Sequence, residues 1–187
     1  MPLQVIGGEA RGRRLKSPPA GVRPTAAIVR RSLFDMLSYL VEDAAVLDLY
    51  AGSGSLGIEA LSRGAASAVF VEKDRRCCAV IKANLAALGE AAGSGRGRVD
   101  CAPAEKWLSS RSGDSGQYDI AVIDPPYGEP GVSRVLSLLV EAEVLSVDAI
   151  VALETRRDAA VEMPDGLSEA RRVHHGDTQL ILMRPTL

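Results

Sequence analysis

Apolar residues recur along the chain in short continuous runs, separated by stretches in which they recur at helical spacing. Runs at 45–50, 68–71, 118–124 and 149–153 are bounded by turn residues and predict buried strands. Apolar positions three and four apart predict helices over 55–63, 75–88, 103–111 and 132–145. Strands that alternate with helices predict βαβ units and a mostly parallel sheet.

Three weaker strand patterns complete the expected sheet. One lies at 98–101, and two others, at 169–174 and 178–183, flank the turn His175-Gly176-Asp177. The last two predict a closing antiparallel hairpin. The expected fold class is therefore α/β and Rossmann-like: a mostly parallel, seven-stranded sheet with an antiparallel last strand.

The N-terminal segment has a different pattern. Residues 3–6 are apolar, Gly7 and Gly8 interrupt them, and cations dominate 11–16, which predicts a β-hairpin with a basic tip or edge. Residues 17–21 form a Pro- and Gly-containing linker. We expect residues 1–24 to be a basic arm and residues 25–187 to form the main domain.

The next helix should begin after Thr25, a good N-cap residue. Its apolar stripe is built from residues at helical spacing: Val29, Leu33, Met36, Leu37 and Leu40. Arg30 and Arg31 lie off this stripe. The basic side of the helix is therefore expected to join the arm.

Charge is polarised along the chain, although the net charge is only −2. Seven cations crowd the first 31 residues against one acid, Glu9. Such asymmetry is typical of a nucleic-acid-binding arm, and a solvated basic tail is the alternative. The expected phosphate contacts are Arg11, Arg13, Arg14, Lys16, Arg23 and Arg30. Such contacts would position an RNA without reading its sequence.

Cysteine usage and hydropathy indicate the cellular compartment. The three cysteines form no CxxC pair, which suits a reducing compartment. No apolar run has the length of a membrane span, and no metal-ligand spacing occurs. A cytoplasmic protein without a metal is expected.

A glycine turn, residues 50–57, follows the first strand of the main domain. Gly52, Gly54 and Gly57 fit the dinucleotide pattern, and Glu72 ends the next strand, where a ribose-binding acid is expected. Asp48, however, would repel a pyrophosphate. S-adenosylmethionine (SAM) has no phosphate and carries a cationic amino group and a sulfonium, which acids attract. The pattern favours SAM over NAD or a purely structural turn.

The fourth strand of the predicted order ends in DPPY, residues 124–127. Prolines have no N–H, so the Asp124 carboxylate and the Pro125 carbonyl are acceptors suited to an exocyclic NH₂ group. Tyr127 offers a flat face on which an extruded base can stack. These residues predict methylation of a planar amino group. The alternative is a proline-rich loop whose tyrosine packs on the core.

DPPY resembles the signature of methyltransferases that act on adenine N6 or guanine N2. VIGG at 5–8, RGRRLK at 11–16, RPT at 23–25, RSLF at 31–34 and the segment 48–60 closely resemble the RsmD family. The resemblance implies a class I SAM-dependent methyltransferase that modifies a guanine N2 in the head of bacterial 16S ribosomal RNA. It also implies S-adenosylhomocysteine (SAH) as product and an assembled or late-precursor 30S subunit as substrate. We expect the chain to be a monomer.

The resemblance also implies site residues. The catalytic group is Asp124, Pro125 and Tyr127. The cofactor contacts are Asp48, Tyr50, Ala51, Gly52, Gly54, Glu72, Lys73, Ala104 and Asp124. One departure concerns Pro103, which stands where an acid is expected to contact the adenine amino group. Glu105 or the Ala104 backbone would have to replace that acid.

Three other functions share parts of this pattern. A DNA or RNA adenine-N6 methyltransferase would carry DPPY, but DNA enzymes usually need a larger target-recognition region. A non-catalytic ribosome-assembly factor would retain the fold. An NAD-linked oxidoreductase is the weakest alternative, because no acid–base pair accompanies the glycines.

Overall fold

The computed structural model describes residues 3–18, 26–89, 95–111, 117–126, 129 and 131–186. The helices in this part of the chain are α1 Ala27–Met36, α2 Ser55–Ser62, α3 Arg75–Leu88, α4 Ala104–Ser109 and α5 Val132–Glu141. The strands are β1 Ala45–Leu49, β2 Ser67–Glu72, β3 Gly97–Cys101, β4 Tyr118–Ile123, β5 Leu145–Arg156, β6 Leu167–His175 and β7 Thr178–Pro185. The alternation of strands and helices is the one that the apolar pattern predicts.

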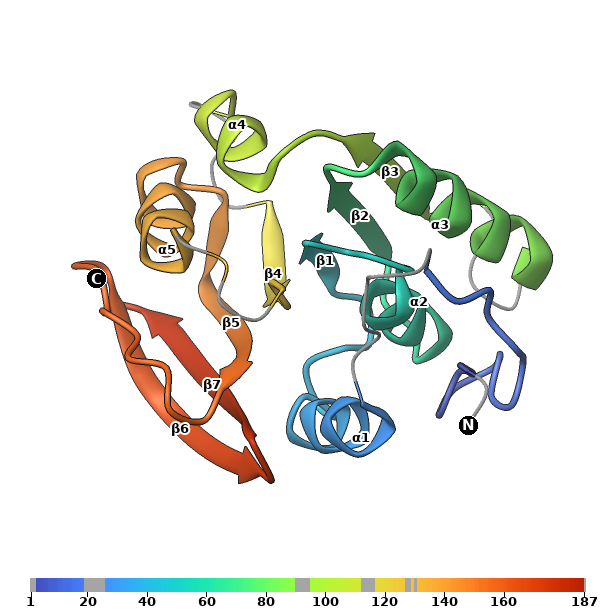
Figure 1. Cartoon of the computed structure of the whole chain (residues 1–187), viewed down its shortest axis with the longest axis horizontal. Helices are drawn as coiled ribbons and strands as arrows, with labels where there is room; N and C mark the ends of the chain where they lie inside the picture. Colours follow the sequence, from blue (N-terminus) through green and yellow to red (C-terminus); the bar gives the residue numbers. More distant parts are fainter. Residues whose placement is uncertain are drawn as a thin grey trace.

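Within the described residues, seven strands form one sheet in the order β3-β2-β1-β4-β5-β7-β6 (Figure 1). β1 pairs in parallel with β2 and β4, and β7 is antiparallel to both β5 and β6. The predicted α/β sheet with its antiparallel β7 is confirmed. β5 is longer than the predicted 149–153 and α5 ends before 145, because the chain turns at Glu143, whose φ is 52°.

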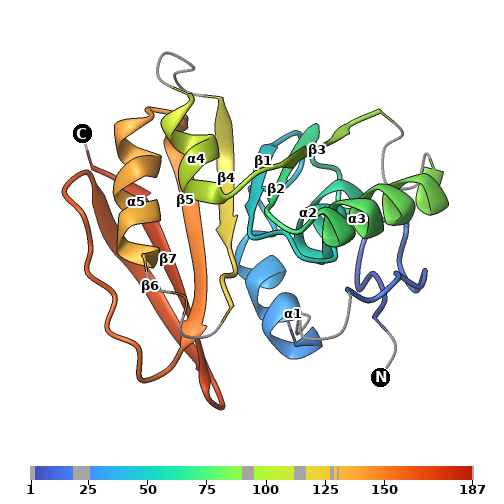
Figure 2. The ribbon, with the colours of Figure 1, turned by 45° about the horizontal axis from the view of Figure 1, so that its top comes forward.

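Two apolar cores cover the two faces of the sheet. Alternate strand residues such as Val46 and Phe70 pack with α1, α2 and α3 on one face. Their neighbours, such as Leu47 and Val71, pack with α4 and α5 on the other (Figure 2). Both faces of the central strands are therefore buried, which explains their continuous apolar runs. No helix in the described part of the chain is both long and apolar enough to cross a bilayer.

The described part of the N-terminal arm folds back on itself as predicted. Gln4 and Arg14 form an isolated antiparallel bridge, and the Leu15 N–H donates to the Leu3 carbonyl at 2.9 Å. Leu3, Val5, Ala10 and Leu15 are buried in the same core as α1, α2 and α3. The arm is thus anchored on the main core. The predicted boundary at residue 24 lies outside the described residues and stays a prediction.

Gly57 allows α2 to approach β2 closely. A Cβ at this position would lie 2.4 Å from Cε1 of Phe70, whose ring is fully buried. Alanine improves helix propensity by up to about 1 kcal/mol, but overpacking costs about 1–3 kcal/mol. We therefore expect Gly57→Ala to lower the free energy of unfolding, measured by urea denaturation. Gly57 has no left-handed φ, so the expected loss measures overpacking and not backbone strain; an unchanged unfolding curve would contradict it.

Candidate active site

The candidate site lies at the carboxyl ends of β1, β2 and β4. β1 has neighbours on both sides that the chain reaches by crossovers in opposite directions, so this edge is the topological switch point of the sheet. The glycine turn leaves β1 here. Tyr50, Gly52 and Gly54 have φ values of 59°, 55° and 76°, so the backbone reverses sharply before α2 begins. The structure thus places the predicted turn at the edge where such sheets bind ligands.

Glu72 ties the glycine turn to the end of β2. Its Oε2 accepts from the Gly52 N–H and its Oε1 accepts from the Asp74 N–H, both at 2.8 Å. A carboxylate oxygen has more than one acceptor position, so each oxygen can accept a further hydrogen bond. Glu72 therefore fixes the turn and keeps the capacity to accept hydroxyl groups.

Asp48 lies beneath the turn and is 1% exposed. Its Oδ2 accepts from the Gly57 N–H at 2.9 Å, and its Oδ1 is buried with no hydrogen-bond partner among the described residues. Burial raises the pKa of Asp48 to about 8, the Gly57 hydrogen bond opposes this, and the charges of Asp124 and Glu72 raise it further. Asp48 holds the start of α2, and a cationic ligand beside it would favour its ionised form.

The pKa of Asp48 makes a prediction about stability. Between its ordinary value of 3.8 and the folded value of about 8, the folded chain binds more protons than the unfolded chain. The free energy of unfolding therefore falls as pH rises through this window. Asp48→Asn keeps an acceptor for Gly57 and cannot ionise. We expect its melting temperature to rise relative to that of the wild type from about pH 4 to about pH 8. A constant difference in melting temperature between the variant and the wild type across this pH range would contradict the prediction.

A cavity of about 260 Å³ lies beside the glycine turn. Tyr50 donates from its hydroxyl to Glu105 Oε1 at 3.3 Å, and Lys73 pairs with Glu129 at 3.0 Å. The walls of this cavity are Tyr50, Val71, Lys73, Ala102, Pro103, Ala104, Glu105 and Glu129. The structure thus brings Tyr50, Lys73 and Ala104 together around one cavity. Pro103 lies in the wall, and Glu105 next to it supplies a carboxylate.

The charges at this edge suit a cation better than a phosphate. Asp48, Glu72 and Asp124 are close enough for the last two to raise the pKa of the first. A pyrophosphate placed among them would be repelled by the charges of Glu72 and Asp124. A ligand with an ammonium or sulfonium group would instead be attracted to these charges. The residues therefore fit SAM and disfavour NAD.

The proline turn follows β4 directly beside β1. The Asp124 N–H donates to the Leu49 carbonyl at 3.4 Å, Asp124 is half-buried, and Pro125 is buried. Tyr127 lies outside the described residues. A second cavity of about 200 Å³ is lined by Pro125, Pro126, Glu129, Gly131, Val132, Ser133, Thr155, Ala159, Ala160 and Val161. Glu129 lines both cavities, and its N–H donates to the Pro126 carbonyl at 2.9 Å.

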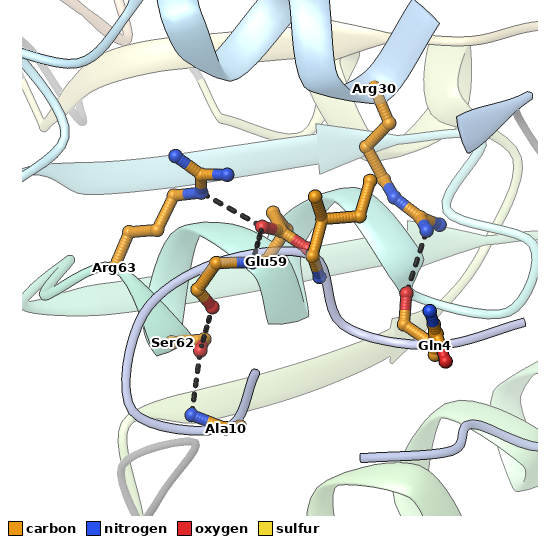
Figure 3. A network of polar contacts seen from close by, with 8 residues as sticks. Gln4, Ala10, Arg30, Glu59, Ser62 and Arg63 are labelled. Atoms are coloured by element: carbon orange, nitrogen blue, oxygen red, sulfur yellow. Dashed lines mark hydrogen bonds and ion pairs between the residues drawn. The ribbon is translucent and has the colours of Figure 1, made fainter. Parts of the chain in front are cut away.

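Of the predicted RNA-binding residues, those described on the arm are exposed and Arg30 on α1 is buried. Arg11, Arg13, Arg14 and Lys16 are exposed on the arm, and Arg23 lies outside the described residues. The expectation that Arg30 lies off the buried face of its helix is wrong. Its side chain is 2% exposed, and its Nη2 donates to the Gln4 carbonyl at 2.7 Å (Figure 3). The arm covers this side of α1, which makes the buried face wider than the apolar stripe.

Three buried polar residues were not found from the sequence. Glu59 and Ser62 on α2 and Asn84 on α3 are each 1% exposed, and each binds backbone groups of the arm. A signal for Asn84 did exist. It follows Ile81 by three residues and precedes Leu88 by four, so it lies on the apolar stripe of its helix.

Known proteins resemble this chain along most of its length. Ribosomal RNA small subunit methyltransferase D of Escherichia coli is 36% identical over 154 residues, which cover 82% of this chain and 74% of that protein. The protein of that name in Haemophilus influenzae is 32% identical over 87% of this chain and 83% of its own length. The family model described as Conserved hypothetical protein 95 matches residues 3–184. The chain belongs to this family.

Solved structures agree with membership of the Conserved hypothetical protein 95 family. The structure of yhhF from Escherichia coli superposes with a TM-score of 0.85 at 34% identity, covering 99% of this chain and 98% of that one. HI0767 from Haemophilus influenzae gives a TM-score of 0.83 at 28% identity, with 99% of both chains covered. The predicted resemblance to the RsmD family, the fold class and the enzyme class, a methyltransferase, are thereby confirmed.

Proposed function

We propose that this chain transfers the methyl group of SAM to the exocyclic N2 of one guanine in 16S ribosomal RNA, presented in an assembled or late-precursor 30S subunit. One structural observation carries the proposal. Pro125, which follows Asp124 at the end of β4, lines the cavity beside the end of β5, and Glu129 lines both this cavity and the one beside the glycine turn. The names of the relatives support the RNA substrate.

SAM is the methyl donor, and the residues around the first cavity would hold it. Glu72 accepts hydrogen bonds from hydroxyl groups while it fixes Gly52. Val71, Pro103 and Ala104 offer apolar surface, and Glu105 offers an acceptor that replaces the acid expected at position 103. Asp48, Ala51, Gly54 and Lys73 complete the proposed contacts, and a cationic ligand would favour the ionised form of Asp48.

The protein's part in the reaction is positioning. The bound donor supplies an electrophilic methyl group on a sulfonium. The guanine N2 forms the new N–C bond as the S–C bond breaks, the electron pair stays on sulfur, and N2 loses a proton to Asp124 or water. The Asp124 carboxylate and the Pro125 carbonyl accept hydrogen bonds from the amine and orient its lone pair. Tyr127 stacks on the base. Holding the two reactants in line supplies most of the rate enhancement.

RNA is held by the arm. Arg11, Arg13, Arg14 and Lys16 present their cations to solvent on a segment that is fixed to the core, and Arg23 belongs to the same arm. Such cations bind phosphates, so binding should weaken steeply as salt rises. The chain acts as a monomer on its subunit in the cytoplasm.

Mapping the methylated nucleotide tests the proposal. Purified protein and tritiated SAM are incubated with undermethylated 30S subunits, naked 16S RNA and duplex DNA. We expect methyl transfer to a single guanine N2 on subunits. Methylation of adenine N6 in either nucleic acid, or subunit binding with no methyl transfer under any condition, would overturn it.

A further inference from the structure

Asn84 joins two parts of the proposed site that are far apart in the sequence. Its Oδ1 accepts from the Lys16 N–H at 2.7 Å. Its Nδ2 donates to the Lys16 carbonyl at 3.1 Å and to the Ser53 carbonyl at 3.0 Å. Lys16 belongs to the basic arm, and Ser53 lies between Gly52 and Gly54 in the glycine turn. One buried side chain thus holds both segments.

The remaining anchors of the arm have no such double contact. The Ile6 and Gly7 N–H groups donate to Glu59, the Ala10 N–H donates to Ser62 Oγ at 2.9 Å, and Ser62 Oγ donates to the Gly7 carbonyl at 2.6 Å (Figure 3). These bonds fix the arm to the body of α2. Among the described residues, Asn84 is the side chain that forms hydrogen bonds to both the arm and the glycine turn.

The chemistry of the amide makes this link specific. An amide supplies one acceptor oxygen and two N–H donors, and Asn84 uses both kinds at once. A buried carbonyl that loses its donor incurs a desolvation cost, so the position of Ser53 and the position of Lys16 depend on each other through one rigid group. Asn84 also lies on α3, which packs against β2 and β3.

We propose that Asn84 is a positioning residue that couples cofactor binding at the glycine turn to RNA binding by the arm. This inference rests on the proposed function. A ligand that orders the turn restrains Ser53, and through Asn84 it restrains Lys16 and the cations beside it. The coupling is reciprocal, so RNA on the arm tightens cofactor binding by the same factor.

Binding of SAH with and without undermethylated 30S subunits measures the coupling. We expect the subunits to tighten SAH binding to the wild type within the usual allosteric range of about 5- to 150-fold. Asn84→Ala removes all three bonds, and Asn84→Asp keeps the acceptor for Lys16 N–H but turns a carboxylate toward the Ser53 carbonyl. Both should reduce the factor to near one.

Ser62→Ala is the matched control. It removes an equally buried anchor of the arm that does not touch the turn. We expect weaker subunit binding with the coupling factor retained. If the Asn84 variants keep the wild-type factor, or if Ser62→Ala loses it to the same extent, the inference is wrong.

Amide exchange of the arm gives a readout that needs no RNA. The Leu15 N–H bonds to Leu3 within the arm, so Asn84 is not its partner. SAH should slow its exchange in the wild type and in Ser62→Ala but not in Asn84→Ala. Unchanged protection in Asn84→Ala would reject the link. Absence of methyl transfer by the wild type, with the protection pattern as expected, would instead reject the proposed function.

Discussion

Asp124→Ala lowers the methyl-transfer rate on subunits by at least about 100-fold while SAH still binds. A misplacement of about 1 Å at the reacting centre costs a factor of this size, and the variant removes one of the two acceptors that orient the amine. Asp124 stands at the end of β4, where its N–H bonds to Leu49 and its carboxylate is close enough to raise the pKa of Asp48. Single-turnover kinetics with saturating SAM measure the rate.

Two variants control this experiment. Asp124→Asn keeps one acceptor oxygen without the charge, so its rate should fall between those of the wild type and Asp124→Ala. Asp119→Ala alters an acid on the same strand at its other end, where it accepts from Ala45 N–H and Ser146 Oγ. That variant should methylate normally. Wild-type turnover in Asp124→Ala would contradict the role assigned to this carboxylate.

Glu59→Ala should destabilise the fold by about 3–5 kcal/mol, the usual cost of removing one partner of a buried ion pair. Glu59 is 1% exposed and accepts from Ile6 N–H, Gly7 N–H and Arg63 Nε at 2.7–2.8 Å. It also offsets the burial that lowers the pKa of Arg30. The variant therefore leaves buried donors and a buried cation without compensation. Urea unfolding measures the loss.

The control for Glu59 is an exposed ion pair. Glu141 pairs with Arg134 at 2.7 Å on the surface of α5, where more than half of each side chain is exposed. Because such pairs contribute about 0–1 kcal/mol, Glu141→Ala should leave the unfolding curve almost unchanged. Equal effects of the two substitutions would show that the Glu59 network does not stabilise the arm.

Local patterns predicted the elements well because their causes are local. The helix predicted over 75–88 does begin at Arg75, and the Asp74 side chain caps it by accepting from the Arg76 N–H at 2.8 Å. The strand predicted to end at DPPY is β4, which lies beside β1 with Leu49 paired to Ile123. Arg30 was misjudged because the helical pattern shows only which side chains are apolar. It cannot show that the arm covers a cation and supplies a carbonyl for it.

The sequence by itself determined the order of strands and helices, the glycine turn, the proline turn and the basic arm, because spacing, caps and turn residues act within a few positions. Tertiary structure alone decided which buried polar groups link these parts. Asn84 reaches Lys16 across 68 positions and Ser53 across 31, and Glu59 reaches Ile6 across 53. A buried amide or carboxylate must find partners wherever packing brings backbone groups near, and no local pattern records that choice.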